Sequence, residues 1–160
     1  MKNSAAAMSI STTAAMIRTF LFFCISFAIV GKAQVDVSTS QLAGIKWKKT
    51  SPVSKRETIT MMFSETNFTD SIYYSSLNKT VGNSLSYYIT DELPSYSVFH
   101  SDYVGKERTG CYIVMYYPKV NDVDYFTVVS FTDDELVLFH KAKPDPVPGL
   151  DMYIKYERIR

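Results

Sequence analysis

The chain has 160 residues and a formal net charge of +1, from seventeen basic and sixteen acidic side chains. A near-neutral chain lacks the basic excess of nucleic-acid-binding proteins, and no block of like charge indicates a polyanion or membrane-surface site. The length allows one domain and a targeting segment.

The first 33 residues have the pattern of a secretory signal peptide. Lys2 and Arg18 precede an apolar run over residues 20–30, which is too short for the ~20 apolar residues of a membrane-spanning helix. Gly31 and Ala33 are small residues of the kind that signal peptidase accepts, so we expect cleavage after Ala33. An uncleaved anchor is the alternative. Cleavage removes three basic residues and no acid, leaving a domain of charge −2 in the periplasm, the cell envelope or the medium.

The segment that follows the cleavage site is polar. Residues 34–41 are expected to be a flexible lead, in which Thr39 or Ser40 caps a short helical turn running into Leu42. Only Cys111 remains in the exported domain, so no internal disulfide can form. An exported domain without disulfides favours a bacterial origin.

The exported part is rich in residues that favour β-strands. All twelve tyrosines lie in it, together with Trp47, and such side chains pack well on a pleated surface. Runs of these residues separated by turn residues predict strands over residues 45–50, 57–63, 68–74, 84–90, 111–117, 124–131, 135–141 and 152–159. Residues 77–83 are expected to be a turn region, and a short strand is expected near 96–99 inside the irregular stretch 91–110.

The connections predict the topology. No helical pattern is long enough to cross over between parallel strands, and short connections force antiparallel neighbours. Eight or nine antiparallel strands form either a barrel or a sandwich. A closed barrel has the advantage that it leaves no exposed edge strand.

Three segments resemble the lipocalin-like domains of small bacterial exported proteins. They are Leu42–Trp47 with its glycine before a strand-one tryptophan, the late hairpin at residues 128–138, and Tyr156-Glu157-Arg158 in the last strand. The resemblance covers about residues 42–159 and implies an eight- to nine-stranded up-and-down barrel over 42–160. It also implies that Trp47 closes the barrel base and that Arg158 packs on its ring by a cation–π contact. Two residues separate Gly44 from Trp47, one more than in the lipocalin pattern.

The sequence offers little for catalysis or metal binding. Two separated histidines and one cysteine do not supply the three or four ligands of a zinc site. No nucleophile elbow or glycine-rich phosphate loop occurs, so we expect no enzyme, no cofactor and no metal, with a hydrolase as the weakest alternative. Asp70-Ser71-Ile72 resembles an O-glycosylation motif of some Gram-negative bacteria.

The leading hypothesis is an exported binding module that holds an apolar or amphipathic small molecule in the barrel. Alternate residues of each strand face a barrel interior, which gives the candidate lining Phe63, Tyr74, Tyr88, Tyr112, Tyr116 and Phe126. The alternation leaves open which tyrosine of each adjacent pair points inward. The alternative function is a protein-interaction or envelope-structural barrel with a filled core, in which residues 91–110 form the recognition loop.

Overall fold

The structure is a computed structural model that describes residues 34–143 and 149–160, so the predicted signal peptide lies outside the described residues. The described chain is almost wholly β, as predicted. Its eight longer strands are β2 (Lys46–Ser51), β3 (Glu57–Phe63), β4 (Asn67–Tyr74), β5 (Lys79–Thr90), β7 (Tyr112–Tyr117), β8 (Asp122–Phe131), β9 (Glu135–His140) and β10 (Met152–Arg158). Its shorter elements are β1 (Val37–Ser38), α2 (Thr39–Leu42), the 3-10 turn η1 (Ser101–Tyr103) and β6 (Thr109–Gly110).

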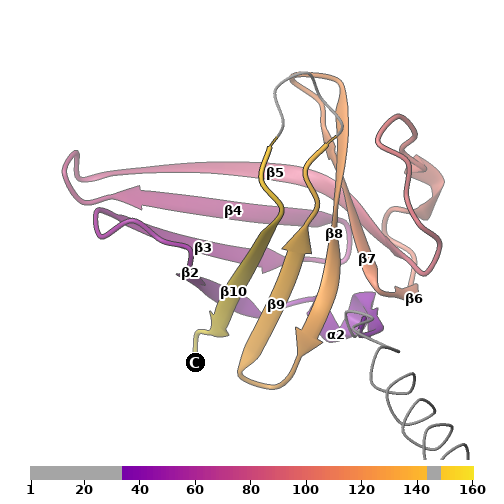
Figure 1. Ribbon diagram of the computed structural model, residues 1–160, viewed down its shortest axis with the longest axis horizontal. Coiled ribbons are helices and arrows are strands. Elements are labelled where there is room, and N and C mark those ends of the chain that lie inside the picture. The colour runs from indigo at the N-terminus through magenta and orange to yellow at the C-terminus, as the bar shows by residue number, and fades with distance from the viewer. Residues whose placement is uncertain (1–33, 144–148) are drawn as a thin grey trace, which may run out of the picture. The chain divides into compact units, whose positions relative to one another are not determined.

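The eight longer strands form one closed antiparallel barrel (Figure 1). Each strand pairs with the next in the chain, β5 pairs with β7 past the excursion of residues 91–111, and β10 closes the barrel on β2. The predicted barrel is therefore confirmed against the sandwich. Among the described residues, none of the helices has the length and apolar character that crossing a membrane requires.

The predicted strands agree with the observed ones to within two residues, except at β5. That strand begins at Lys79, which pairs with Tyr74, because the chain reverses at Asn78 in a left-handed conformation with φ 46°. The turn predicted over 77–83 is therefore too long, and Gly82 lies within the strand. The short strand predicted near 96–99 is absent from the described chain, where these residues are irregular.

The strands differ in length, and this shapes the barrel. β5 has twelve residues, whereas β9 has six. Figure 1 shows β4 and β5 projecting to the left of the strands that cross in front of them, β8, β9 and β10. Part of the inner face of β3, β4 and β5 therefore extends beyond the opposing wall.

The opposite end of the barrel, which we call the base, is filled with hydrophobic side chains. Trp47, Phe63, Ile113 and Leu136 have no exposed surface, and Tyr87 is 1% exposed. The Phe63 ring packs edge-on against that of Tyr87 at 5.2 Å between centroids. Burial of such side chains contributes roughly 1.5–3 kcal/mol each, so the base is a major source of stability.

Residues 34–42 seal this base, which corrects the flexible lead predicted for 34–41. Val37 and Leu42 are fully buried in the core, and β1 pairs with β6. Ser38, rather than Thr39 or Ser40, caps α2: its hydroxyl accepts the Gln41 N–H while the Gln41 side chain accepts the Ser38 N–H. Val37 before the N-cap and Leu42 in the fourth helical position pack together with Val35 on the core, and they order a segment that is otherwise polar.

Gly110 permits the close approach of β6 to the end of β5. A Cβ at this position would lie 2.1 Å from the carbonyl carbon of Thr90, which no real contact allows. The backbone of Thr90 occupies the space that any side chain at this buried position would need, so only glycine fits there.

Candidate functional site at the barrel mouth

The inner face of the barrel changes character beyond the base. Side chains there are partly exposed, and many are polar or charged. We call this part the barrel mouth. The residues that define it are Lys49, Ile59, Asp70, Ile72, Val81, Tyr117, Asp124, Phe126 and His140, together with the buried Tyr156, the register partner of Lys49.

A row of aliphatic side chains crosses the projecting part of the mouth. Ile59 of β3 is the register partner of Ile72 of β4, which in turn is the partner of Val81 of β5. They lie on the same face as the buried Phe68, because side chains two residues apart share a face of a strand. Ile59 and Ile72 are only half-buried, and Val81 is 43% exposed. This aliphatic row is therefore an apolar surface left open at the mouth.

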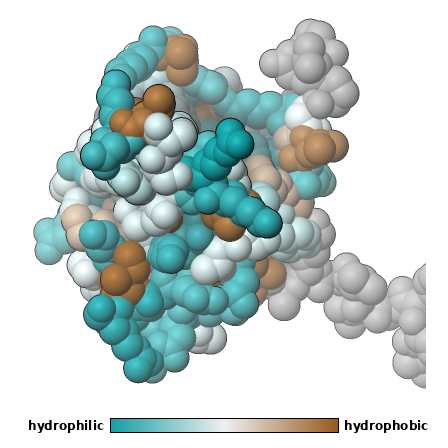
Figure 2. Space-filling model, turned by 90° about the vertical axis from the view of Figure 1, so that its left-hand side faces the viewer, coloured by the Kyte–Doolittle hydropathy of each residue, from teal (hydrophilic) through white to brown (hydrophobic). Residues whose placement is uncertain are grey.

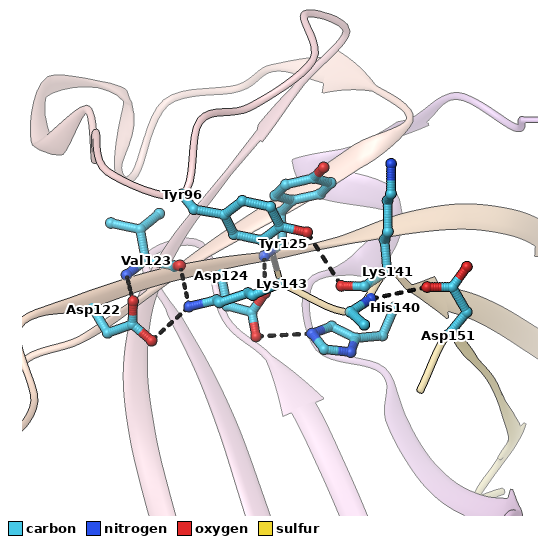
Figure 3. A network of polar contacts seen from close by, with 10 residues as sticks. Tyr96, Asp122, Val123, Asp124, Tyr125, His140, Lys141, Lys143 and Asp151 are labelled. Carbon is cyan, nitrogen blue, oxygen red and sulfur yellow. Dashed lines mark hydrogen bonds and ion pairs between the residues drawn. The ribbon is translucent and has the colours of Figure 1, made fainter. Parts of the chain in front are cut away.

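A polar network occupies the end of β8 and β9 (Figure 3). The His140 Nε2 lies 2.9 Å from the Asp124 Oδ2, and these side chains are 22% and 16% exposed. At the rim, Lys143 donates to Asp122 at 2.5 Å and to the Val123 carbonyl at 2.7 Å. Both carboxylates on β8 thus have a basic partner.

Two tyrosines of the inner face, Tyr117 and Tyr156, lie within electrostatic reach of the carboxylates. Burial, with smaller contributions from Asp124, Asp70 and Asp122, raises the pKa of Tyr117 to about 12. Burial also raises the pKa of Tyr156, with Asp70 and Tyr117 adding to the effect. The phenols of β7 and β10 and the carboxylate of β4 therefore share the barrel interior, close enough for the charge of Asp70 to act on both phenols.

Lys49 brings a positive charge to the same inner face. It is the register partner of Tyr156 across β2 and β10. Burial lowers its pKa, while the nearby Glu57 opposes that shift. The ammonium of Lys49 is therefore partly desolvated, with Glu57 as the acid that offsets it.

Three of the six predicted lining residues face the interior. Phe63 lies deep in the base, Phe126 packs beside His140 with 5.1 Å between ring centroids, and Tyr74 lies at the far end of β4, beyond Ile72. Of these, Phe126 is next to the polar network, and Phe63 is sealed from it. The structure therefore brings only part of the predicted set to the mouth.

The other three predicted lining residues, Tyr88, Tyr112 and Tyr116, lie on the outer face, and their predicted placement is wrong. They belong to a second apolar cluster that residues 96–103 cover from outside. The inward members of the adjacent pairs are Tyr87 and Tyr117. Because this outer face is also buried, Ile113 and Val114 are both fully enclosed, and no alternation in the sequence distinguishes inside from outside.

The predicted base pair is only partly reproduced. Arg158 and Trp47 are register partners on β10 and β2. The guanidinium of Arg158, however, donates to the Asp133 carbonyl at 3.4 Å, and the Trp47 ring packs against Phe131 at 6.1 Å. The hairpin turn thus draws the arginine away from a cation–π contact. The Trp47 Nε1 is buried without a hydrogen-bond partner among the described residues.

Two hollows lie on the outside of the barrel. One, of about 420 Å³, is lined mainly by hydroxyl side chains of β3, β4 and β5, including Ser71 of the predicted glycosylation motif. The other, of about 380 Å³, lies between the irregular segment and β7–β8 and includes Tyr96, Phe99 and Tyr116. Residues 34–143 and 149–160 contain no group of three His, Cys, Asp or Glu side chains arranged to hold a metal ion.

Sequence reasoning missed the polar residues of the mouth. The two histidines were considered only as metal ligands, and Asp70, Asp124 and Tyr156 were not among the candidates. The signal was present in β4, where Phe68, Asp70 and Ile72 alternate with smaller polar residues. A carboxylate inside an inward-facing apolar pattern is a candidate for a functional position.

No protein-family model, curated protein or solved structure matches this chain. The lipocalin-like resemblance therefore stays a prediction, while the barrel itself rests on the strand pairing.

Proposed function

We propose that this protein is an exported, lipocalin-like binding module that takes up a small amphipathic molecule at the barrel mouth. The observation that carries the proposal is the aliphatic row of Ile59, Ile72 and Val81, open on the inner face beside polar side chains. Binding pockets for small molecules combine apolar walls with a few polar groups that fix orientation. The filled base restricts such a ligand to the mouth.

On the side where β4 and β5 project, the outer surface is better suited to a small ligand than to a partner protein with a large apolar interface. Figure 2 shows the side on which β4 and β5 project, and there hydrophobic residues form separate small groups among hydrophilic ones. Protein interfaces with an apolar core need a contiguous apolar patch. The apolar surface that is continuous in register lies instead inside the mouth.

Binding of the uncharged fluorescent dye Nile red tests the proposal. We expect saturable binding by the wild type, and affinity about tenfold weaker in Ile72→Glu, because a carboxylate on the row must be desolvated by an apolar ligand. The matched control is Ser71→Glu, which places the same charge one residue away on the outer face.

Val81→Glu provides a second variant that is safer for folding, since Val81 is 43% exposed. It should weaken the dye as Ile72→Glu does, with circular dichroism showing that the barrel is intact. Absence of dye binding by the wild type, or equal weakening by Ser71→Glu, would contradict a ligand site in the mouth.

The export part of the proposal rests on the sequence of residues 1–33. Expression in a bacterial host with an intact secretion system, followed by mass determination of the envelope fraction, should give a chain that begins at Gln34. Substitution of Ala33 by a bulky residue should abolish this cleavage. A chain recovered whole in the cytoplasm would contradict export.

The alternative function, a protein-interaction barrel, is supported by one observation. Residues 96–103 cover the outer face of β5, β7 and β8 and leave the hollow at Tyr96, Phe99 and Tyr116. Dye binding that is lost in Tyr116→Ala but kept in Ile72→Glu would favour this outer site over the mouth.

A further inference from the structure

Two phenol groups on the inner face of the barrel have hydroxyls that make no hydrogen bond within the described part of the chain. Tyr156 is only 8% exposed, yet its hydroxyl makes no hydrogen bond with any described residue, and the same holds for Tyr117. Buried tyrosine hydroxyls ordinarily have a partner. Trp47 Nε1 is the one sealed polar side-chain atom of the described chain that lacks a partner, so the two phenol oxygens reach open space.

A third acceptor faces the same region. Asp70 lies on the inner face of β4, two residues from Phe68 of the core. One carboxylate oxygen accepts the Asn83 N–H at 3.0 Å. Asp70 has no basic partner among the described side chains, in contrast to Asp122 with Lys143 and Asp124 with His140.

The charges around the two hydroxyls are negative. Asp70, Asp122 and Asp124 act on Tyr117, and Asp70 acts on Tyr156. Two basic groups of the mouth have carboxylate partners, Lys143 with Asp122 and His140 with Asp124, and the acid that acts on Lys49 is Glu57 rather than Asp70. The region between Asp70 and the two phenols therefore favours a cation.

We infer that the mouth binds the ammonium group of an amphipathic amine, held by the Asp70 carboxylate and the hydroxyl oxygens of Tyr117 and Tyr156. A primary ammonium has three N–H donors. The mouth offers three acceptors, which are the Asp70 carboxylate and the two tyrosine hydroxyls. This inference rests on the proposed function and specifies the class of its ligand.

The position of the apolar part of the ligand follows from the register of β4. Ile72 lies two residues beyond Asp70 on the same face, and its partners Ile59 and Val81 continue the aliphatic row across β3 and β5. Two residues along a strand span roughly 6.6 Å, a distance of a few methylene groups. An alkyl chain attached to the ammonium therefore lies along the row.

Displacement of bound Nile red by three ten-carbon amphiphiles tests the inference. Decylamine, decanoate and decanol share one tail and differ in the charge of the head group. Below their aggregation limits, we expect decylamine to displace the dye at a concentration about tenfold lower than decanol needs, since a hydrogen-bonded charge pair typically adds this much. Decanoate should be the weakest.

Asp70→Asn should reduce the preference for decylamine over decanol to less than about twofold, because the amide keeps the acceptor for Asn83 but loses the charge. Tyr117→Phe and Tyr156→Phe should each weaken decylamine and leave decanol unchanged. The matched controls are Asp133→Asn in the exposed turn between β8 and β9 and Tyr116→Phe on the outer face.

The outcomes separate the inference from the proposed function. Equal displacement by all three amphiphiles overturns the ammonium site and leaves a ligand site in the mouth. Preference for decanoate overturns it in favour of Lys49 as the head-group partner. Failure of the dye and all three amphiphiles to bind overturns both proposals.

Discussion

The base and the mouth of the barrel are built from the same strands but follow opposite rules. In the base, Trp47, Phe63 and Tyr87 are enclosed, and the buried Tyr87 hydroxyl donates to the Ser64 carbonyl at 2.7 Å. In the mouth, aliphatic side chains stay partly exposed and the hydroxyl of Tyr156 has no hydrogen-bond partner among described residues. A protein under selection for stability alone gains nothing from leaving an aliphatic row partly exposed beside carboxylates and phenols.

The difference indicates how the fold divides its tasks. The base supplies the hydrophobic burial that holds the barrel closed, and the segment with β1 and α2 completes it from below. The mouth contributes less to folding and is therefore free to carry charged groups. Variants that change one region and spare the other can break or sharpen this division.

The largest effect is expected from Phe63→Ala in the base. Phe63 has no exposed surface and packs against Phe68 and Tyr87, so its truncation should lower the free energy of unfolding by about 3–5 kcal/mol. Urea unfolding followed by Trp47 fluorescence measures the loss. Phe126→Ala in the mouth is the matched control, expected to cost about 1–2 kcal/mol because Phe126 is half-buried. Equal losses would contradict the division.

Alkaline pH should have the next effect, through the mouth tyrosines. Burial and carboxylates raise the pKa of Tyr117 from 10.0 to about 12, and that of Tyr156 is raised as well. Because the folded state keeps these protons longer than the unfolded chain, their stabilisation is complete below pH 10 and is lost as pH rises toward 12. The pKa of Lys49 is lowered from 10.5 in the folded state. Lys49 therefore makes the fold more stable as pH rises only at pH values below 10.5.

The double variant Tyr117→Phe with Tyr156→Phe should lose less stability than the wild type between pH 10 and 12. Urea midpoints across this range provide the measurement, and tyrosinate absorbance reports the titration directly. If both proteins lose stability in parallel, the two phenols titrate as they would in water, and the mouth is more open than the structure shows.

The barrel was predictable from sequence because local signals agreed. Turn residues such as Pro118 and the Thr132–Asp134 hairpin separate runs of β-forming residues, and the short connections leave only antiparallel pairing. The start of β5 was missed because Gly82 and Asn83 have low strand propensity, which pairing with Asp70 and Ser71 overrides.

The mouth could not be predicted to the same degree. Tyr116 and Tyr117 are identical in chemistry, and residues 96–103 cover the outer face, so that both faces of the strand are buried. Which of them faces inward depends on the pairing of β7 with β5 and β8, a non-local property. The convergence of Asp70, Tyr117 and Tyr156 joins three strands that are distant in sequence, so no local pattern contains it.

The smallest effects, and the most direct comparison of the two regions, are expected from removing single hydroxyls. Tyr87→Phe deletes the hydrogen bond to the Ser64 carbonyl and should cost about 1 kcal/mol. Tyr156→Phe deletes a hydroxyl that makes no such bond, so the free energy of unfolding should stay within about 0.5 kcal/mol of the wild type. Thermal and urea unfolding of both variants at neutral pH provide the comparison. A cost for Tyr156→Phe equal to that for Tyr87→Phe would mean that the phenol is satisfied in the free protein, and it would remove one of the three acceptors on which the ammonium site depends.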